Sequence, residues 1–167
     1  VANLITESAN DLQLPISEAI ALFTLSLKLG NKILACGNGG SAADAQHFTS
    51  ELMGRFEKER RPLPAVALTT DTSLLTAVAN DYHFNQVYAR QVYGLGRAGD
   101  VLLAISTSGN SSNIIAAVEA AHKLGVSVVV LTGRDGGMLS KILNQNDILI
   151  NVAHPRTAFI QEVHAIV

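Results

Sequence analysis

Cysteine, charged residues and long apolar runs are all scarce in this sequence, and each scarcity excludes a class of protein. The one cysteine, Cys36, cannot form an internal disulfide and fits a reducing compartment. Charged residues make up 16% of the chain and the formal net charge is −2, which argues against direct binding of nucleic acid. No apolar run approaches the roughly 18 residues of a membrane span, and residues 1–11 lack the basic start and apolar core of a secretory signal. We therefore expect a cytoplasmic protein with no membrane contact and no direct nucleic-acid partner.

Strand and helix patterns alternate along most of the chain, and 48% of its 167 residues are apolar. We expect strands at residues 32–36, 65–68, 101–105, 127–131 and 148–152, and helices from 41, at 72–80, 85–95, 113–124 and 138–143, and from 157. Continuous apolar strands joined by helix-length connections are typical of a parallel sheet covered on both faces. The predicted fold is α/β, a three-layer α/β/α sandwich with a five-stranded parallel sheet. Residues 1–167 are expected to form a single domain.

The first 30 residues precede this sandwich and also have a helical pattern. Pro15 suits the first turn of a helix and Gly30 suits a C-terminal stop. The second of these helices is apolar on more than one face, which predicts that residues 1–30 pack in an oligomer while residues 31–167 form the sandwich. The charged link at residues 57–61 has the composition of a solvated surface, and we assign it no function.

Two loops that follow strands are candidates for binding a phosphate group. Residues 37–41 (GNGGS) connect a strand to a helix start, where free N–H groups and the helix dipole favour an anion. Residues 106–111 (STSGNS) supply four hydroxyls before the next helix. In a parallel sheet both loops lie at the carboxyl edge, where ligands bind. Hydroxyls and N–H groups around one point would make a neutral cradle for a phosphomonoester.

Other interpretations of these loops have to be weighed. The second loop alone could be an ordinary Ser/Asn turn with a helix cap. The first loop also matches the G-x-G-x-x-A dinucleotide fingerprint. A dinucleotide site expects an acidic residue about 20 residues further on, at the end of the next strand. Here that strand ends in Thr69 and Thr70. We therefore expect no nucleotide cofactor.

Several side chains near these loops could carry chemistry. His47 and Glu51 share one face of a helix and could form a metal pair, an acid/base pair or a plain surface pair. Gln161 and His164 could point into the same cleft from the last helix. Asn80 and Asp81 could cap a helix or reach substrate hydroxyls. Cys36 has no basic neighbour to activate it, so we interpret it as a small buried residue.

The motifs GNGGSAADAQHF, ELMGRF, AVANDY, STSGNS, LTGRDGG and IQEVH together cover most of the chain. In this combination the sequence resembles the phosphoheptose isomerases of the sugar isomerase (SIS) domain family. The resemblance implies an aldose-ketose isomerase that converts sedoheptulose 7-phosphate to D-glycero-D-manno-heptose 7-phosphate through an enediolate, toward ADP-heptose and lipopolysaccharide. It also implies a homotetramer with sites between subunits.

The resemblance further assigns roles to individual residues. It implies Glu51 as the catalytic base, zinc as a possible cofactor held by His47, Glu51 and Gln161, and a larger set of substrate contacts. That set is Asn38, Gly39, Gly40, Ser41, Glu51, Asn80, Asp81, Ser106, Thr107, Ser108, Ser111 and Gln161.

The chain departs from the family pattern in a few places. A second catalytic histidine is expected eight positions after Gln161, beyond Val167, so we expect the printed sequence to omit a C-terminal segment. Residues also look to be missing between Ser8 and Pro15, and Ala158 replaces an acidic residue of some members. The alternative function is a non-catalytic SIS scaffold that binds the replication initiator DnaA, or a sugar-phosphate sensor. The scaffold relative lacks the glutamate that matches Glu51, which favours the isomerase.

Overall fold

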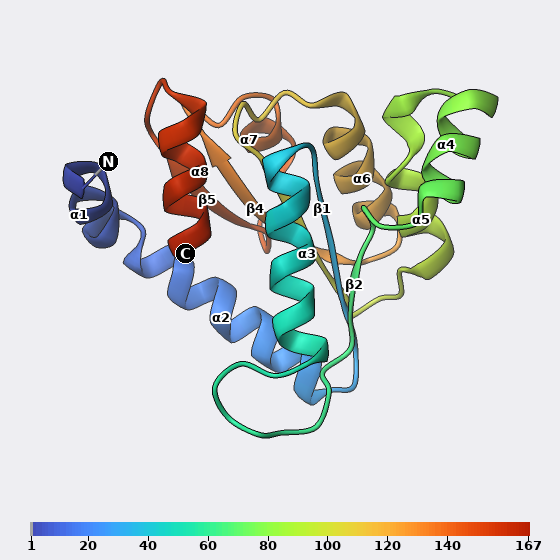
Figure 1. Ribbon diagram of the computed structural model, residues 1–167, viewed down its shortest axis with the longest axis horizontal. Helices are drawn as coiled ribbons and strands as arrows, with labels where there is room; N and C mark the ends of the chain where they lie inside the picture. The colour runs from blue at the N-terminus through green and yellow to red at the C-terminus, as the bar shows by residue number, and fades with distance from the viewer. Residues whose placement is uncertain (1) are drawn as a thin grey trace.

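The fold is the α/β sandwich that the sequence predicts. A computed structural model describes residues 2–167 and contains five parallel strands in the order β2-β1-β3-β4-β5 (Figure 1). The strands are β1 (Ile33–Gly37), β2 (Ala65–Ala67), β3 (Val101–Ser106), β4 (Ser127–Gly133) and β5 (Ile148–Val152). The helices are α1 (Ala2–Asp11), α2 (Gln13–Lys28), α3 (Gly40–Met53), α4 (Thr72–Asp81), α5 (Ala89–Leu95), α6 (Ser112–Lys123), α7 (Leu139–Ile142) and α8 (Thr157–Ile166), with a 3-10 helix η1 (Phe84–Gln86).

Successive strand residues point to opposite faces of the sheet, and each face is buried by its own layer of helices. Leu34 and Cys36 of β1 join a cluster with α4, α5, α6 and α7. Ile33 and Ala35 join a second cluster with α2, α3 and α8. Because both faces are covered, the central strands β1 and β3 are buried along their whole length, which explains their unbroken apolar sequence.

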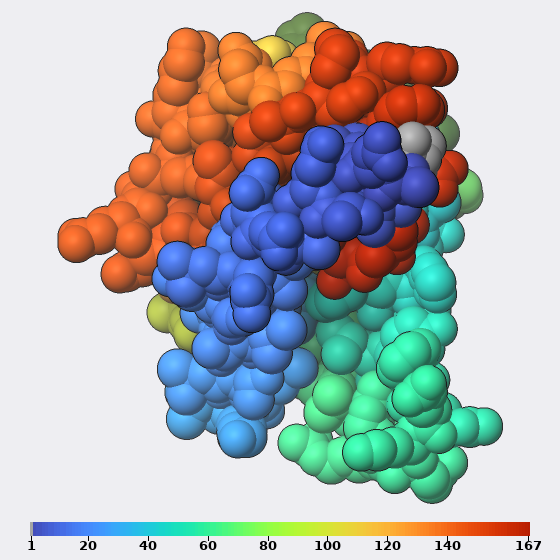
Figure 2. Space-filling model, turned by 90° about the vertical axis from the view of Figure 1, so that its left-hand side faces the viewer, coloured from blue at the N-terminus to red at the C-terminus, as the bar shows by residue number. Residues whose placement is uncertain are grey.

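The first helices take different positions against the sandwich. α2 packs Ala19 and Leu27 onto the same face of the sheet as α3 and α8, so it belongs to that helical layer. α1 lies across α8 at the edge of the layer (Figure 2). Leu14, Ile20 and Leu25 of α2 remain exposed. No helix within residues 2–167 combines the length and apolarity that a bilayer crossing needs.

One predicted helix is wrong in its extent. Residues 85–95 do not form one helix: η1 covers Phe84–Gln86 and α5 begins only at Ala89. The break lies where Tyr88 enters the core and its hydroxyl donates a 2.6 Å hydrogen bond to the carbonyl of Gly37. This tertiary bond links α5 to the end of β1, and helical periodicity contains no signal of it. The other elements match the predicted ones to within one or two residues at most ends.

The strand order creates a crevice at one edge of the sheet. β1 and β3 are neighbours, with Gly37 level with Ile105. The chain leaves β1 toward α3 on one face and leaves β3 toward α6 on the other, so the two connections diverge. In open α/β sheets, ligands bind at such a switch point, beyond the carboxyl ends of the strands.

Candidate functional site

The two predicted phosphate loops meet at this switch point and are tied together by a pair of amides. Asn38, in the loop after β1, donates from Nδ2 to Oδ1 of Asn113 at 2.8 Å. Asn113, in the first turn of α6, donates back to Oδ1 of Asn38 at the same distance. Asn113 is 2% exposed. The two bonds link the loop before α3 to the first turn of α6. One N–H of Asn38 remains for a ligand.

Both helices that start at the crevice lack a side-chain cap. Gly39, before α3, has no side chain that could cap the helix. The side chain of Ser111, before α6, accepts no hydrogen bond from the first turn of that helix. By contrast, Asp71 caps α4 by accepting a 2.9 Å bond from the N–H of Leu74. A carboxylate cap would repel an anion, whereas these two helix starts present positive dipole ends and N–H groups, those of Gly40, Ser112 and Asn113, that have no partner among the described residues. The crevice therefore suits an anionic group such as a phosphate.

Hydroxyl groups surround the same point. Ser41 and Ser106 are buried, and Oγ of Ser106 lies 3.0 Å from Oγ of Ser111. Thr107 and Ser108 are half-buried, and Oγ of Ser108 accepts a 3.2 Å bond from the N–H of Asn110. No lysine or arginine is present in either loop. Hydroxyls and main-chain N–H groups, rather than a cation, would thus neutralise the ligand.

Glycine allows the tight approaches on which the crevice depends. A Cβ on Gly37 would collide with the carbonyl oxygen of Ser41, which shows how sharply the chain turns from β1 into α3. Gly109 has a φ of 65°, and a Cβ there would overlap the carbonyl oxygen of Gly136. The second loop is also bonded to the 136–139 segment, since the N–H of Leu139 donates to Gly109 at 2.9 Å. The loop is therefore packed in place before any ligand binds.

The groups beneath the first loop are inert in acid/base terms. Burial raises the pKa of the Cys36 thiol to about 12, so the thiol is protonated at neutral pH. Burial, together with nearby Cys36, raises the pKa of Tyr88 to about 12. This confirms the interpretation of Cys36 as a small buried residue.

His47 and Glu51 lie further along α3 and contact each other. Nε2 of His47 is 3.3 Å from Oε1 of Glu51, and the two side chains are 77% and 38% exposed. Both line a cavity of about 520 Å³ between α2, α3, α8 and the sheet. The apolar wall of this cavity includes Phe23 and Phe48. No residue of the loops at 37–41 and 106–111 lines this cavity.

Asp44 and His164 form a second polar group in the wall of the Glu51 cavity. His164 Nε2 lies 2.9 Å from the carbonyl oxygen of Thr132, which can only accept, so this nitrogen carries the proton. Its Nδ1 and Oδ2 of Asp44 are buried without a hydrogen-bond partner. Burial lowers the pKa of His164 and raises the pKa of Asp44, although each group's charge partly offsets the effect on the other. Both shifts favour the neutral forms.

The remaining predicted residues occupy different surroundings. Gln161, on α8, lies against Gly40 at the start of α3: its Nε2 is 2.5 Å from where a Cβ on Gly40 would stand. It therefore borders the first phosphate loop and stands at the opposite end of α3 from Glu51. Asn80 and Asp81 are exposed at the end of α4, and their side chains bond only to each other among the described residues, from Nδ2 of Asn80 to Oδ1 of Asp81 at 2.9 Å. Their contact with a substrate stays a prediction.

Sequence reasoning did not identify Asn113, Tyr88 or Arg60 as parts of this region. Asn113 only marked the start of a helix, Tyr88 fell inside a predicted helix, and Arg60 belonged to a link with no assigned function. The bonds that tie these residues to the site join them to Asn38, Gly37 and Glu51, which lie at least nine positions away in the sequence. No local pattern could have revealed these partners.

The amide pair can be tested by a double-mutant cycle on stability and anion binding. Asn38→Ala should lower the free energy of unfolding by about 1 to 3 kcal/mol, because it leaves the buried amide of Asn113 unpaired, and Asn113→Ala should cost less, because Asn38 is half-buried. The double variant should cost little more than Asn38→Ala alone. Urea unfolding measures the energies, and calorimetric titration with inorganic phosphate should show weaker binding in all three. Strictly additive losses would show that the two amides do not act as a pair.

Comparison with known proteins agrees with this geometry. The family described as SIS domain matches residues 1–133. A phosphoheptose isomerase from Neisseria meningitidis serogroup C is 62% identical over 150 residues, covering 90% of this chain and 76% of the relative. The solved structure of phosphoheptose isomerase GmhA from Neisseria gonorrhoeae superposes with a TM-score of 0.94 at 54% identity, covering 99% of this chain and 86% of that one. A phosphoheptose isomerase from Francisella tularensis gives a TM-score of 0.96 at 47% identity, with the same coverages. The chain belongs to the SIS domain family and, within it, to the phosphoheptose isomerases.

Proposed function

We infer that this chain isomerises sedoheptulose 7-phosphate to D-glycero-D-manno-heptose 7-phosphate. The observation that carries this inference is the crevice in which two uncapped helix starts and two hydroxyl loops converge, in a chain that retains Glu51. The crevice matches the phosphate of the substrate. The relatives named above are isomerases, and no feature of the structure favours a scaffold or a sensor.

The reaction requires a general base beside C1 and C2 of the sugar. Glu51 takes the proton from C1 of the ketose, the electrons form the C1–C2 double bond of an enediolate, and the C2 oxygen gains negative charge. The hydroxyl proton on O1 passes to O2, and return of the abstracted proton from Glu51 to C2 leaves a carbonyl at C1, which gives the aldose. A positioned carboxylate contributes about 10² to 10⁴ in rate. Glu51 suits this role because it is partly exposed at a cavity and its carboxylate has no ion pair among the described residues other than the one with His47.

The distance between the two halves of the site favours a shared site between copies of the chain. Ser41 and Glu51 are ten residues apart in α3, which separates them by about 15 Å along the helix axis. The two halves are also lined by different residues, since no residue of the phosphate loops lines the cavity of Glu51. We therefore propose that Glu51 of one copy serves the phosphate crevice of another.

Exposed apolar side chains support such an assembly. Leu14, Ile20 and Leu25 of α2 and the following Leu29 are more than half exposed, and Phe56 lies beyond the end of α3. Apolar surface of this extent is typical of an interface. We propose a homotetramer in which residues 1–30 contribute to the contacts.

His47 and Glu51 fit two positions of a zinc site. Ligands about 2.0 to 2.2 Å from a tetrahedral zinc ion lie about 3.3 to 3.6 Å apart, and Nε2 of His47 and Oε1 of Glu51 are 3.3 Å apart. Residues 2–167 of one chain hold no group of three His, Cys, Asp or Glu side chains that could bind a metal. Gln161, at the other end of α3, would have to come from a second copy. A bound zinc ion would supply positive charge that stabilises developing negative charge.

Replacing Glu51 tests the assignment of the base. Glu51→Gln should reduce turnover of sedoheptulose 7-phosphate by about 10² to 10⁴, because the amide cannot accept the proton. The dissociation constant for the sugar phosphate should change little. Ser106→Ala with Ser108→Ala should instead weaken binding. Full-length protein is required, with turnover followed by separation of the two heptose phosphates. Unchanged turnover in Glu51→Gln would remove Glu51 as the base.

Mixing two inactive variants tests the shared site. Chains carrying Glu51→Gln and chains carrying Ser106→Ala with Ser108→Ala should regain activity when co-expressed. In randomly mixed assemblies roughly a quarter of shared sites combine an intact crevice with an intact Glu51. Sites contained within one chain would never combine them. Activity that stays at the level of the separate variants would therefore contradict a shared site.

Metal analysis tests zinc without reference to activity. Protein purified without chelator should contain about one zinc per chain, and His47→Ala should lower this content because it removes one ligand. His83→Ala, at an exposed histidine outside both cavities, is the matched control. Mass spectrometry of the acid-digested protein measures the content. Equal zinc in the His47 and His83 variants, or none in any of them, would exclude this site.

A further inference from the structure

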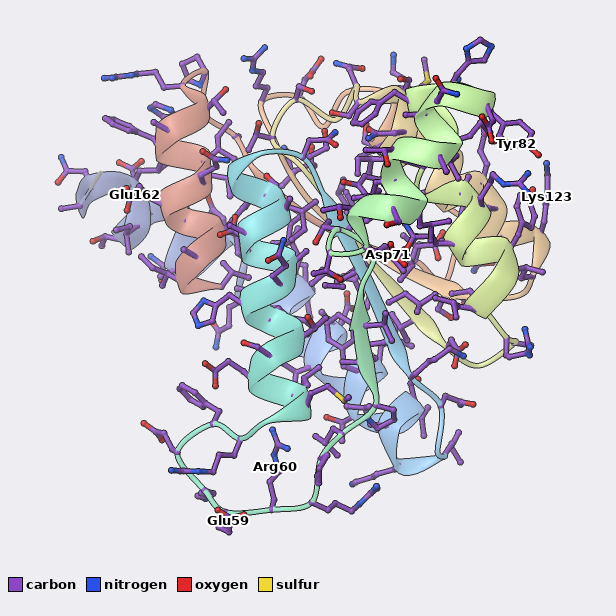
Figure 3. All side chains as sticks on the ribbon, turned by 45° about the vertical axis from the view of Figure 1, so that its right-hand side comes forward. Glu59, Arg60, Asp71, Tyr82, Lys123 and Glu162 are labelled. Carbon is purple, nitrogen blue, oxygen red and sulfur yellow. The ribbon has the colours of Figure 1, made fainter. Side chains whose placement is uncertain are left out.

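The charged link after α3 contains one arginine whose environment differs from that of its neighbours. Arg61 is exposed, and Arg55 makes only a 3.6 Å contact from its Nε to Oε2 of Glu59, with both side chains in solvent. Arg60 is half-buried and lines the Glu51 cavity. Its side chain extends from the link toward the last turn of α3 (Figure 3). The link is therefore more than a solvated surface at this one position.

The guanidinium of Arg60 binds the end of α3 through its main chain. Nη2 donates to the carbonyl oxygen of Glu51 at 2.6 Å, and Nη1 donates to that of Leu52 at 2.9 Å. Nη1 also donates to the carbonyl oxygen of Arg61 at 3.0 Å, which closes the link on itself. The last four carbonyls of a helix lack partners within the helix, and a cation at this end opposes the helix dipole. Arg60 therefore caps the C-terminus of α3, together with the N–H of Leu63, which also donates to the carbonyl oxygen of Leu52 at 3.0 Å.

This cap holds the main chain of the residue that carries the proposed base. Glu51 lies two residues before the end of α3, in the turn most prone to fray. Its side chain is held only by His47 among the described residues, so its direction depends on the geometry of that turn. A displacement of about 1 Å in a catalytic group can cost about 10²-fold in rate.

We propose that Arg60 is a positioning residue for the isomerase reaction, which it serves by fixing the last turn of α3 and hence the direction of the Glu51 carboxylate. The proposal rests on the proposed function, because it assigns the reaction a further residue. It requires no contact between Arg60 and the substrate. It therefore predicts an effect on kcat rather than on KM.

The experiment compares Arg60→Ala, Arg60→Lys and Arg61→Ala in the full-length protein. Arg60→Ala should lower kcat roughly 10- to 100-fold with KM changed less than about twofold. Arg60→Lys should recover part of kcat, because an ammonium group can donate to one carbonyl but lacks the planar fork. Arg61→Ala, which removes an exposed neighbour of the same type, should behave as the wild type. Amide hydrogen exchange in residues 51–55 should be faster in Arg60→Ala than in Arg61→Ala.

The possible results separate this role from others. A raised KM with unchanged kcat in Arg60→Ala would indicate direct substrate binding and overturn the proposal. A kcat loss that matches the loss of folded protein, measured by circular dichroism, would reduce Arg60 to a stabilising residue. Equal kcat in the Arg60 and Arg61 alanine variants would also contradict it. An inactive wild type would instead overturn the proposed function, while faster exchange in Arg60→Ala would still show the cap.

Discussion

The architecture of the site depends on the unpaired N–H groups at the starts of α3 and α6. The two helices begin on opposite faces of the sheet, at the ends of neighbouring strands, so their positive ends converge only because β1 and β3 are adjacent. The reciprocal bonds of Asn38 and Asn113 then hold both starts at a fixed separation. With no side-chain cap on either helix, the crevice offers its donors to a ligand. These donors suit the phosphate of the proposed substrate.

The two halves of the proposed site lie at opposite ends of α3. Its first turn faces the phosphate crevice, and its last turn carries Glu51 beside a separate cavity. The length of α3 fixes the separation of these two ends. The proposed site therefore combines the start of α3 from one copy of the chain with the end of α3 from another. The end that carries Glu51 is held by Arg60, and the start borders Gln161. Both ends of α3, which carry the residues of the proposed site, are therefore held by side chains from elsewhere in the chain.

Much of the fold follows from local sequence. The buried runs at β1 and β3 have no polar side chain to interrupt them, and glycines or hydroxyl residues end them, so strand positions and the parallel sheet could be predicted. The helix at residues 85–95 could not, because its break depends on Tyr88 bonding to Gly37 far away in the chain. The candidate loops were recognisable because glycine and serine cluster directly after strands. The residues that support them were not, since Asn113 and Arg60 have ordinary local surroundings.

The sequence by itself determined the sheet, the two phosphate loops and the family, because strand periodicity, glycine turns and motif order are properties of neighbouring residues. Only the tertiary structure decided which loops meet, since that depends on β1 pairing with β3 on one side while it pairs with β2 on the other. It also decided that Gln161 lies by the crevice while Glu51 lines another cavity. The sequence motifs assign both residues to one site, but the length of α3 separates them within one chain. The role of Arg60 became visible for the same reason: the carbonyls of Glu51 and Leu52, to which it donates, have no partner within α3 because the helix ends there.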